Sequence, residues 1–221
     1  TSQVRANPSA GFSIVSYTGN YTANSTIGHS LNAAPELIIC KCRTSSDWWP
    51  VYHKSLGNTQ AMYLNETNGA ASSAMWSNTS PTTQVFTVGE NDNTNKNNGD
   101  IIAYCFSPVE GYSAFGSYTG NGSSDGTFVY TGFTPRWVMV KGTNISSHWR
   151  IWDSAREPNN PKDNTLHPSD SQTETHYGAD DVDFLSNGFK NRNTGSYQNN
   201  SGNTYIYAAF AENPFKAARA R

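Results

Sequence analysis

The sequence predicts an all-β protein, an antiparallel β-sandwich built from an internal duplication of about 100 residues. Its apolar stretches are short, rich in β-branched and aromatic residues, and separated by clusters of Gly, Asn and Pro, as strands and turns are. No stretch carries a helical period with capping residues, and helical turns are plausible only at residues 70–77 and 214–221. Several short sequence segments of the first half recur in the second half.

The recurring segments keep their order, and the difference in residue number between matching segments is almost constant. The clearest begins as Gly11-Phe12-Ser13 and returns as Gly111-Tyr112-Ser113, and both copies run on to a Tyr-Thr-Gly-Asn turn. Each copy also closes on a similar apolar strand. The matching segments are 11–20 and 111–121, 35–41 and 135–141, 49–53 and 149–153, and 102–107 and 206–211. The period is too long for solenoid or propeller repeats, whose units have about 20–50 residues.

Each copy is expected to contribute about six strands, giving about a dozen in all. The almost continuously apolar segments 37–41 and 137–141 should lie in the middle of a sheet. The other expected strands are 12–17 and 113–118, 51–53 and 150–153, the weaker segments 61–64, 84–88 and 183–185, and the closing strands 102–107 and 206–211.

The chain divides at the repeat boundary. Residues 1–10 form an N-terminal lead-in, 11–110 the first repeat and 111–215 the second. Because only residues 107–110 join the copies, we expect them to pack as one compact unit. The basic tail 216–221 is either a frayed terminus or a contact to a neighbouring subunit. The start at Thr1, without Met, favours a C-terminal piece of a longer chain.

Composition excludes several classes of protein. Charged residues make up 14% of the chain, against roughly 25% in ordinary domains. An aromatic content of 13% argues against disorder. The net charge is −2 and the cationic residues are scattered, so neither a nucleic-acid partner nor membrane insertion is expected. No apolar run approaches the ~20 residues of a membrane helix.

The three cysteines are expected to be small buried hydrophobic residues. Cys40 and Cys42 lie two apart on one predicted strand, which keeps them too far apart to bridge each other. A bridge between Cys40 and Cys105 across two strands stays open. The spacing of these residues does not fit a zinc site.

The sequence offers little for catalysis. The acidic cluster of Asp180, Asp181 and Asp183 is a weak candidate for a metal site or a carboxylate pair and more typical of an acidic turn. Five scattered histidines show no helical zinc spacing, and no nucleophile elbow is present. We therefore expect a protein that is not an enzyme and uses no cofactor.

Aromatic residues beside the central strands favour carbohydrate binding. Sugars stack on aromatic faces while amide, carboxylate and guanidinium groups recognise their hydroxyls. The alternative is that the Trp residues are core and that Asp153 and Arg156 pair to order a loop. The candidate ligand-binding residues are Trp49, Tyr52, His53, Trp149, Arg150, Trp152, Asp153 and Arg156.

Three long sequence segments, at residues 125–135, 183–190 and 205–215, resemble those of a known family. Together with the duplication they resemble a domain of unknown function that recurs at the C-terminal end of large phage virion proteins, mostly of marine phages. The resemblance covers about Arg5 to Phe215. It implies a concanavalin A-like or jelly-roll sandwich on tail fibres or other appendages, in contact with host-surface glycans. The family carries no catalytic motif to transfer.

The expected function is that of a virion structural domain, most simply a tail-fibre adhesin that binds host-surface carbohydrate by aromatic stacking. One alternative is a capsid decoration or assembly module without a glycan ligand. A second is a glycan depolymerase, which needs two carboxylates about 5–10 Å apart in a cleft. The expected partners are other virion subunits, with a homo-trimer favoured, and the expected location is the surface of the virion.

Overall fold

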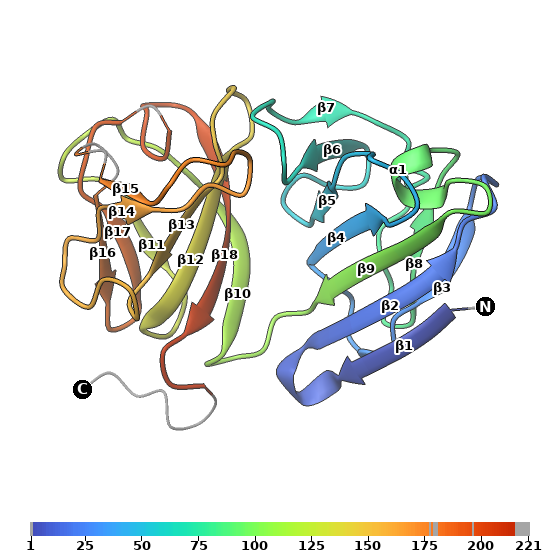
Figure 1. Cartoon of the computed structure of the whole chain (residues 1–221). Helices are drawn as coiled ribbons and strands as arrows, with labels where there is room; N and C mark the ends of the chain where they lie inside the picture. Colours follow the sequence, from blue (N-terminus) through green and yellow to red (C-terminus); the bar gives the residue numbers. More distant parts are fainter. Residues whose placement is uncertain (1, 177, 179–180, 196, 215–221) are drawn as a thin grey trace. The chain divides into compact units, whose positions relative to one another are not determined.

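The computed structural model describes residues 2–176, 178, 181–195 and 197–214, and these residues form antiparallel sheets with almost no helix (Figure 1). The predicted all-β class is confirmed. The chain divides into two compact units. Unit 1 comprises the chain as far as Pro108 without Thr67–Gly69, and those three residues belong with the chain from Val109 onwards to unit 2. That the halves pack as one compact unit stays a prediction.

The main sheet of unit 1 has the strand order β1-β2-β9-β4-β5-β6-β7. Its strands are β1 (Ser2–Asn7), β2 (Phe12–Thr18), β4 (Leu37–Cys42), β5 (Pro50–His53), β6 (Gln60–Tyr63), β7 (Ala71–Ser72) and β9 (Asp100–Phe106). β2 and β9 alternate between buried and more exposed residues, as expected of antiparallel strands with one face on a core. β4 lies between β9 and β5, in the mid-sheet position that its apolar sequence predicted.

A second, smaller sheet of unit 1 pairs β3 (Ser25–Gly28) with β8 (Val85–Val88). Phe86 and Val88 of β8 share a buried cluster with Val15 and Tyr17 of the main sheet. Trp76, from the loop before β8, is also buried in this cluster. The apolar faces of the two sheets therefore enclose one core, which makes unit 1 a sandwich.

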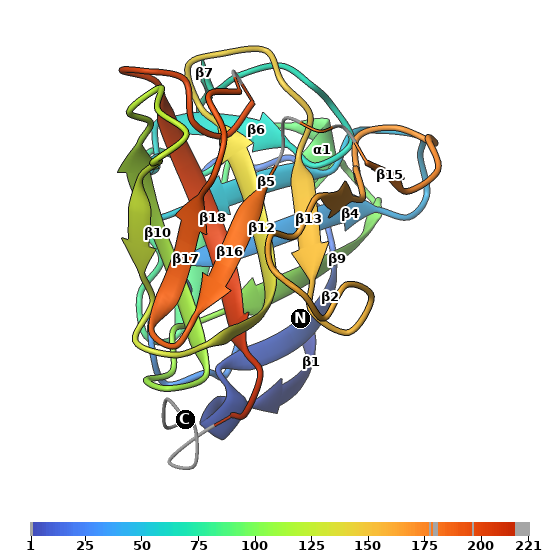
Figure 2. The same ribbon diagram turned by 90° about the vertical axis from the view of Figure 1, so that its left-hand side faces the viewer.

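Unit 2 has the same layered construction, seen in Figure 2 with β16 and β17 over the larger sheet. Buried residues of both sheets, among them Val138, Trp152 and Phe189, form its core. The larger sheet has the order β10-β18-β12-β13, the second β11-β17-β16, and β14 pairs with β15. Their bounds are β10 (Ser113–Thr119), β11 (Phe128–Tyr130), β12 (Pro135–Gly142), β13 (Arg150–Asp153), β14 (Asn164–Thr165), β15 (Thr175–His176), β16 (Val182–Leu185), β17 (Gly188–Asn191) and β18 (Thr204–Ala211).

The two larger sheets have a common strand order. β2-β9-β4-β5 in unit 1 corresponds to β10-β18-β12-β13 in unit 2, and in each set the last strand along the chain lies between the first and the central strand. Side chains at corresponding positions of the two units also make corresponding hydrogen bonds. The Tyr17 hydroxyl donates to the carbonyl oxygen of Thr94 at 2.6 Å, and the Tyr118 hydroxyl donates to that of Gln198 at 2.7 Å.

Several local expectations need correction. Residues 2–7 are not only a lead-in, because β1 pairs with β2 along its whole length, and Pro8–Ala10 form a short 3-10 helix. The helical turn expected at 70–77 is absent, since this stretch holds β7 and non-helical turns. A short helix, α1 (Asp92–Asn95), lies instead in the Asn-rich loop. The tail 216–221 lies outside the described residues.

The three cysteines are buried, and each is a free thiol. Cys40 and Cys105 therefore form no bridge, and the predicted role as small core residues is confirmed. Burial raises the pKa of the Cys105 thiol to about 12 and also raises the pKa of Cys40. No described helix has the length and apolar character needed to cross a membrane.

Candidate functional site

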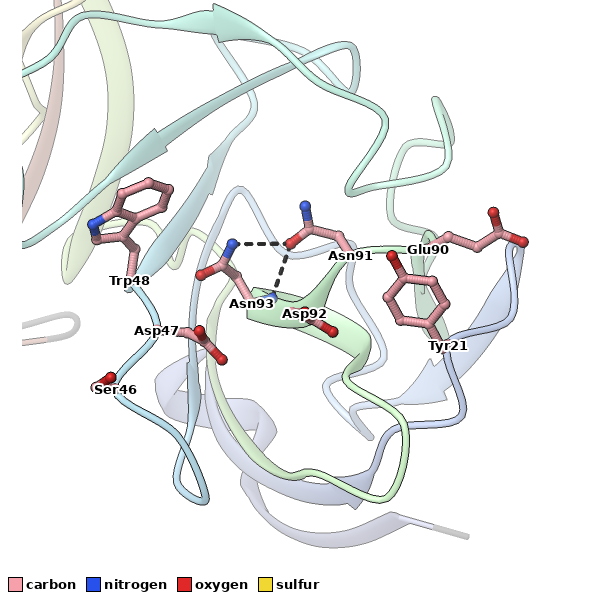
Figure 3. Close-up of a pocket in the computed structure, with 8 residues that line it drawn as sticks. All are labelled: Tyr21, Ser46, Asp47, Trp48, Glu90, Asn91, Asp92 and Asn93. Atoms are coloured by element: carbon pink, nitrogen blue, oxygen red, sulfur yellow. Dashed lines mark hydrogen bonds between the residues drawn. The ribbon is translucent and has the colours of Figure 1, made fainter.

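A pocket of about 550 Å³ opens on unit 1 where three loops meet (Figure 3). One loop follows β2, one joins β4 to β5, and one leads into α1. Its lining residues are Tyr21, Ser46, Asp47, Trp48, Glu90, Asn91, Asp92 and Asn93. The lining combines two aromatic rings with carboxylates and amides, which are the groups that bind sugars.

The two aromatic rings lie on opposite sides of the pocket in Figure 3. Trp48 is 49% exposed and Tyr21 is 46% exposed. The Trp48 ring packs against Tyr63, with the ring centroids 4.9 Å apart and the planes tilted by 47°. This contact supports one face of the indole, so that an apolar ligand face would meet a ring already held in position.

The backbone around Tyr21 is held by the buried residue Asn95. The Asn95 side-chain amide donates to the carbonyl oxygens of Thr22 and Gly89, both at 3.0 Å, and its carbonyl oxygen accepts from the Asn20 N–H at 3.0 Å. The N–H of Tyr21 donates to the Asn95 main-chain oxygen at 2.9 Å. Tyr21 takes a φ of 53°, a left-handed conformation that is uncommon for a bulky residue. Such local strain is often retained at functional sites.

The loop before α1 supplies the polar part of the pocket. The Asn91 side chain caps α1 by accepting from the Asn93 N–H at 2.9 Å, and it accepts from the Asn93 amide at 3.1 Å (Figure 3). The cap fixes the loop that also carries the exposed residues Glu90 and Asp92. Hydrogen-bonding groups thus stand between the two rings on an ordered backbone.

Asp47 is the most constrained carboxylate of the pocket. The Ser45 hydroxyl donates to its Oδ2, and Lys96 Nζ lies 3.4 Å from the same oxygen. The Ser45 hydrogen bond has the largest effect and lowers the pKa of Asp47; burial acts in the opposite direction, and the charge of Lys96 lowers the pKa further. Asp47 is therefore an ionised acceptor at neutral pH, suited to binding hydroxyl groups and unsuited to donating a proton.

The sequence-predicted site residues of the first repeat do not line this pocket. Tyr52 is buried edge-on against Trp76, with the centroids 5.7 Å apart, and His53 is 1% exposed. Trp49 is half-buried, and Lys41 Nζ lies 5.8 Å from the centre of its ring. Neighbouring tryptophans in an extended segment face opposite ways. The exposed ring is accordingly that of Trp48, next to the residue predicted.

The predicted residues of the second repeat divide between core and surface. Trp149, Arg150 and Trp152 are each no more than 2% exposed, and the Arg150 guanidinium stacks at 4.3 Å on the ring of Tyr197. Asp153 and Arg156 lie nearer the surface and approach each other within 4.0 Å. Arg156 also pairs with Glu174, and Asp153 with Arg136 at 3.8 Å. This is the loop-ordering ion pair that was the alternative interpretation.

The acidic cluster is only partly described, because Asp180 lies outside the described residues. Asp183 pairs with Arg192 at 3.3 Å, and the Asp181 main-chain oxygen accepts from the Arg192 N–H at 2.8 Å. These contacts are those of an acidic turn leading into β16. Among the described residues, the side chains that bring three metal-ligating atoms together are others: His148, His167 and Asp170.

This histidine cluster lies in unit 2, where the segment before β13 meets the loop after β14. Asp170 Oδ2 is 3.2 Å from His148 Nδ1 and 3.3 Å from His167 Nδ1. Burial lowers the pKa of His167, and the positive charge of Arg150 lowers it further. Although burial acts to raise the pKa of Asp170, hydrogen bonds from Gln172 N–H and His167 lower it overall. The cluster therefore combines an ionised carboxylate with a neutral imidazole near pH 7.

A family model, a domain of unknown function designated DUF7483, matches residues 1–214. The chain belongs to the DUF7483 family. No curated protein and no solved structure matches the chain. The match spans nearly the stretch over which the sequence resembled a domain of unknown function. The DUF7483 family comes with no assigned activity, and the pocket and the histidine cluster are the features of this DUF7483 chain that bear on its function.

The predicted site residues include none of the residues that line the pocket, such as Tyr21, and none of the three residues of the cluster. The Tyr21 position carries a signal, since it directly follows the Thr-Gly-Asn turn, where an aromatic ring has little opportunity to be buried. His148 and His167 are separated by 18 intervening residues. Only the pairing of β13 with the segment after β14 brings them together, so spacing along the chain could not reveal them.

Proposed function

We propose that this chain is a non-enzymatic module of a phage virion appendage, an adhesin that binds host-surface carbohydrate in the pocket between Trp48 and Tyr21. The observation that carries the proposal is the pocket itself, in which two exposed aromatic rings flank carboxylates and amides. A pyranose has one apolar face and a rim of hydroxyls, which matches that distribution of groups.

The low charge of the chain supports a role outside the cell. Charged residues make up 14% of the sequence, so little stability depends on surface ion pairs that salt would screen. A virion appendage meets variable ionic strength, and this composition suits it. The proposed partners are other virion subunits, arranged as a trimer, and the proposed location is the virion surface.

An ancestral duplication is part of the same proposal. The common strand order of the larger sheets, the paired bonds of Tyr17 and Tyr118, and the paired asparagines Asn95 and Asn199 support it. The family resemblance adds the concanavalin A-like or jelly-roll type of sandwich. One copy would then have acquired a ligand pocket while the other kept the shared scaffold.

A glycan depolymerase is the second candidate, because Asp47, Glu90 and Asp92 line one pocket. Glycoside hydrolysis needs one carboxyl with a raised pKa to protonate the leaving group. The pKa of Asp47 is lowered instead, so Asp47 does not fit the role of that acid and would be the second, ionised carboxylate of the pair. Release of reducing ends from a glycan that the protein binds, abolished by Asp47→Asn, would support the depolymerase and contradict the adhesin.

The proposal is tested with a glycan array, followed by affinity measurement on the glycans that bind. Trp48→Ala should weaken binding at least tenfold, which corresponds to about 1.4 kcal/mol. Tyr130→Ala is the matched control, because Tyr130 is an exposed aromatic residue of unit 2, 67% exposed and outside the pocket. It should leave binding unchanged.

Two outcomes would overturn the adhesin. In one, no glycan binds while the protein assembles specifically with virion proteins, and this supports the decoration or assembly module. In the other, Tyr130→Ala weakens binding as much as Trp48→Ala does, so that the pocket is not the binding site.

A further inference from the structure

We propose that His148, His167 and Asp170 form a Zn²⁺-binding site in unit 2, independent of the carbohydrate pocket. The ligands would be the Nδ1 atoms of the two imidazoles and the Oδ2 atom of the carboxylate. Each residue offers an atom that lies within 4.8 Å of the other two. Neither the family description nor the spacing of these residues along the chain assigns such a site.

The sheet brings the three residues together. Ile151 of β13 pairs with Leu166, and each N–H donates to the carbonyl oxygen of the other, at 3.0 and 3.2 Å. Continued along this antiparallel register, His148 falls opposite Ser169, and the Ser169 hydroxyl indeed lies 3.0 Å from His148 Nδ1. His148 and His167 become diagonal neighbours across the two segments, a separation that long side chains bridge.

The distances suit a tetrahedral ion. Zn²⁺ binds imidazole nitrogen at about 2.0–2.1 Å and carboxylate oxygen at about 2.0–2.2 Å, so neighbouring ligand atoms lie about 3.4 Å apart. The two Nδ1–Oδ2 distances are 3.2 and 3.3 Å. The carboxylate is thus already at the spacing of a shared ion from both imidazoles.

Surrounding groups hold the ligands in place. The Gln172 N–H donates to Asp170 Oδ1 at 3.0 Å, which leaves Oδ2 for the imidazoles. The Thr165 hydroxyl lies 3.4 Å from His167 Nε2, on the far side of the ring from the proposed ligand atom. A metal-binding histidine usually has a hydrogen-bond partner at its second nitrogen, which fixes the orientation of the ring.

One adjustment is required for the ion to bind. The two imidazole rings are stacked, with centroids 4.8 Å apart and planes 14° from parallel, so both lone pairs cannot meet one ion without rotation of a ring. The His148 side chain is 31% exposed whereas that of His167 is 4% exposed. Rotation of the more exposed His148 ring meets this need at the cost of the Ser169 contact to its Nδ1, and its exposed edge provides the entry path for the ion.

The ligand set selects the class of metal. A single carboxylate offsets the nearby positive charge of Arg150, whose effect reaches His167. Little net negative charge therefore remains to attract Ca²⁺ or Mg²⁺, which also prefer sites made of oxygen ligands. Two imidazoles and a carboxylate suit Zn²⁺, with the fourth position left to water. Bound zinc would tie the segment before β13 to the loop after β14.

The test is Zn²⁺ binding to the full chain after treatment with a chelator, measured by titration calorimetry and by the shift in Tm. We expect one ion per chain and a rise in Tm. His148→Ala and Asp170→Asn should each weaken binding at least tenfold. His176→Ala is the matched control, because His176 also contacts a carboxylate, Asp163 at 2.6 Å, but its side chain is 60% exposed and outside the cluster.

Co²⁺ absorption spectra distinguish the ligands even if a variant folds poorly. The expected spectrum of the parent protein is that of a tetrahedral site with nitrogen and oxygen ligands. A thiolate-to-metal band would assign the ion to the cysteines of unit 1 and overturn the proposal. So would the failure of Zn²⁺ to bind, binding that is unchanged in both cluster variants, or binding that is lost equally in His176→Ala.

Discussion

Corresponding loops of the two units carry different side chains on a similar framework. The segment between the central strand and the next strand displays Trp48 in unit 1 and His148 in unit 2. The turn after the first strand displays Tyr21 in unit 1 and Gly122 in unit 2, both with positive φ. The chemistry of the two surfaces therefore differs at positions that the framework treats alike, and ligand binding and framework can be changed separately.

The framework beneath these positions is held by matched bonds. Asn95 accepts from the Asn20 N–H at 3.0 Å, and Asn199 accepts from the Asn121 N–H at 3.1 Å. The N–H groups of Tyr21 and Gly122 donate to the main-chain oxygens of the same two asparagines. A hydrogen bond present in both units is expected to stabilise the fold. A surface side chain present in only one unit is expected to bind the ligand of that unit.

The largest expected effect comes from removing these asparagines. Each is at most 1% exposed and makes at least three side-chain hydrogen bonds. Asn95→Ala and Asn199→Ala should each lower the free energy of unfolding by about 3 kcal/mol, because buried partners are left unpaired. Urea denaturation measures the effect. If one of the two variants loses less than about 1 kcal/mol of unfolding free energy, the two asparagines do not have the same role.

The next effect is a pH dependence of opposite sign in the two units. Burial lowers the pKa of Lys141 in unit 2 from 10.5 to about 8. Between these values the unfolded chain binds the proton more tightly, so stability rises with pH. In unit 1, burial raises the pKa of Cys105 from 9.0 to about 12, so stability falls as pH rises above 9.

Comparing each variant with the parent protein isolates these two groups. Between pH 8 and 10, the stability of Lys141→Met relative to the parent should fall by about 2 kcal/mol. The stability of Cys105→Ala relative to the parent should rise by about 1 kcal/mol over the same range. Denaturant titrations at several pH values measure both differences. If the two differences change with pH in the same direction, burial does not control the pKa values of both groups.

Removal of the paired tyrosine hydroxyls should have a smaller, matched effect. Tyr17→Phe and Tyr118→Phe each delete one buried hydrogen bond to a main-chain oxygen and leave that oxygen without its donor. Each should cost about 1.5 kcal/mol of unfolding free energy. Thermal and urea denaturation provide the measurement, and costs that differ by more than about 1 kcal/mol would mean that the two hydroxyls are not equivalent.

The smallest effect concerns the left-handed turn. In Tyr21→Gly, relief of strain and added freedom of the unfolded chain oppose each other, so stability should change by less than about 1 kcal/mol while glycan binding weakens. Gly122→Ala should destabilise unit 2 by about 1 kcal/mol. The added Cβ would sit 3.0 Å from Ser201 Cβ at a φ of 67°. If Tyr21→Gly binds the glycan with full affinity, the Tyr21 side chain does not contribute to glycan binding.

The strand pattern was predictable because period and composition are local properties. Leu37–Cys42 and Thr204–Ala211 are strands whose apolar runs already indicated them. The edge strand Ser2–Asn7 was missed, because its polar residues gain strand geometry only by pairing with β2. None of the predicted ligand-binding residues lines the pocket. Trp49 is only the neighbour of Trp48, because alternation cannot say which of two adjacent tryptophans faces the core.

By itself, the sequence determined the all-β class, the mid-sheet position of the central strands and the burial of the cysteines, since all three follow from local apolar pattern and side-chain size. Only the tertiary structure decided which aromatic rings stay at the surface and which histidines meet. Those outcomes depend on strand register and loop packing, which join residues far apart in the chain, such as His148 and His167.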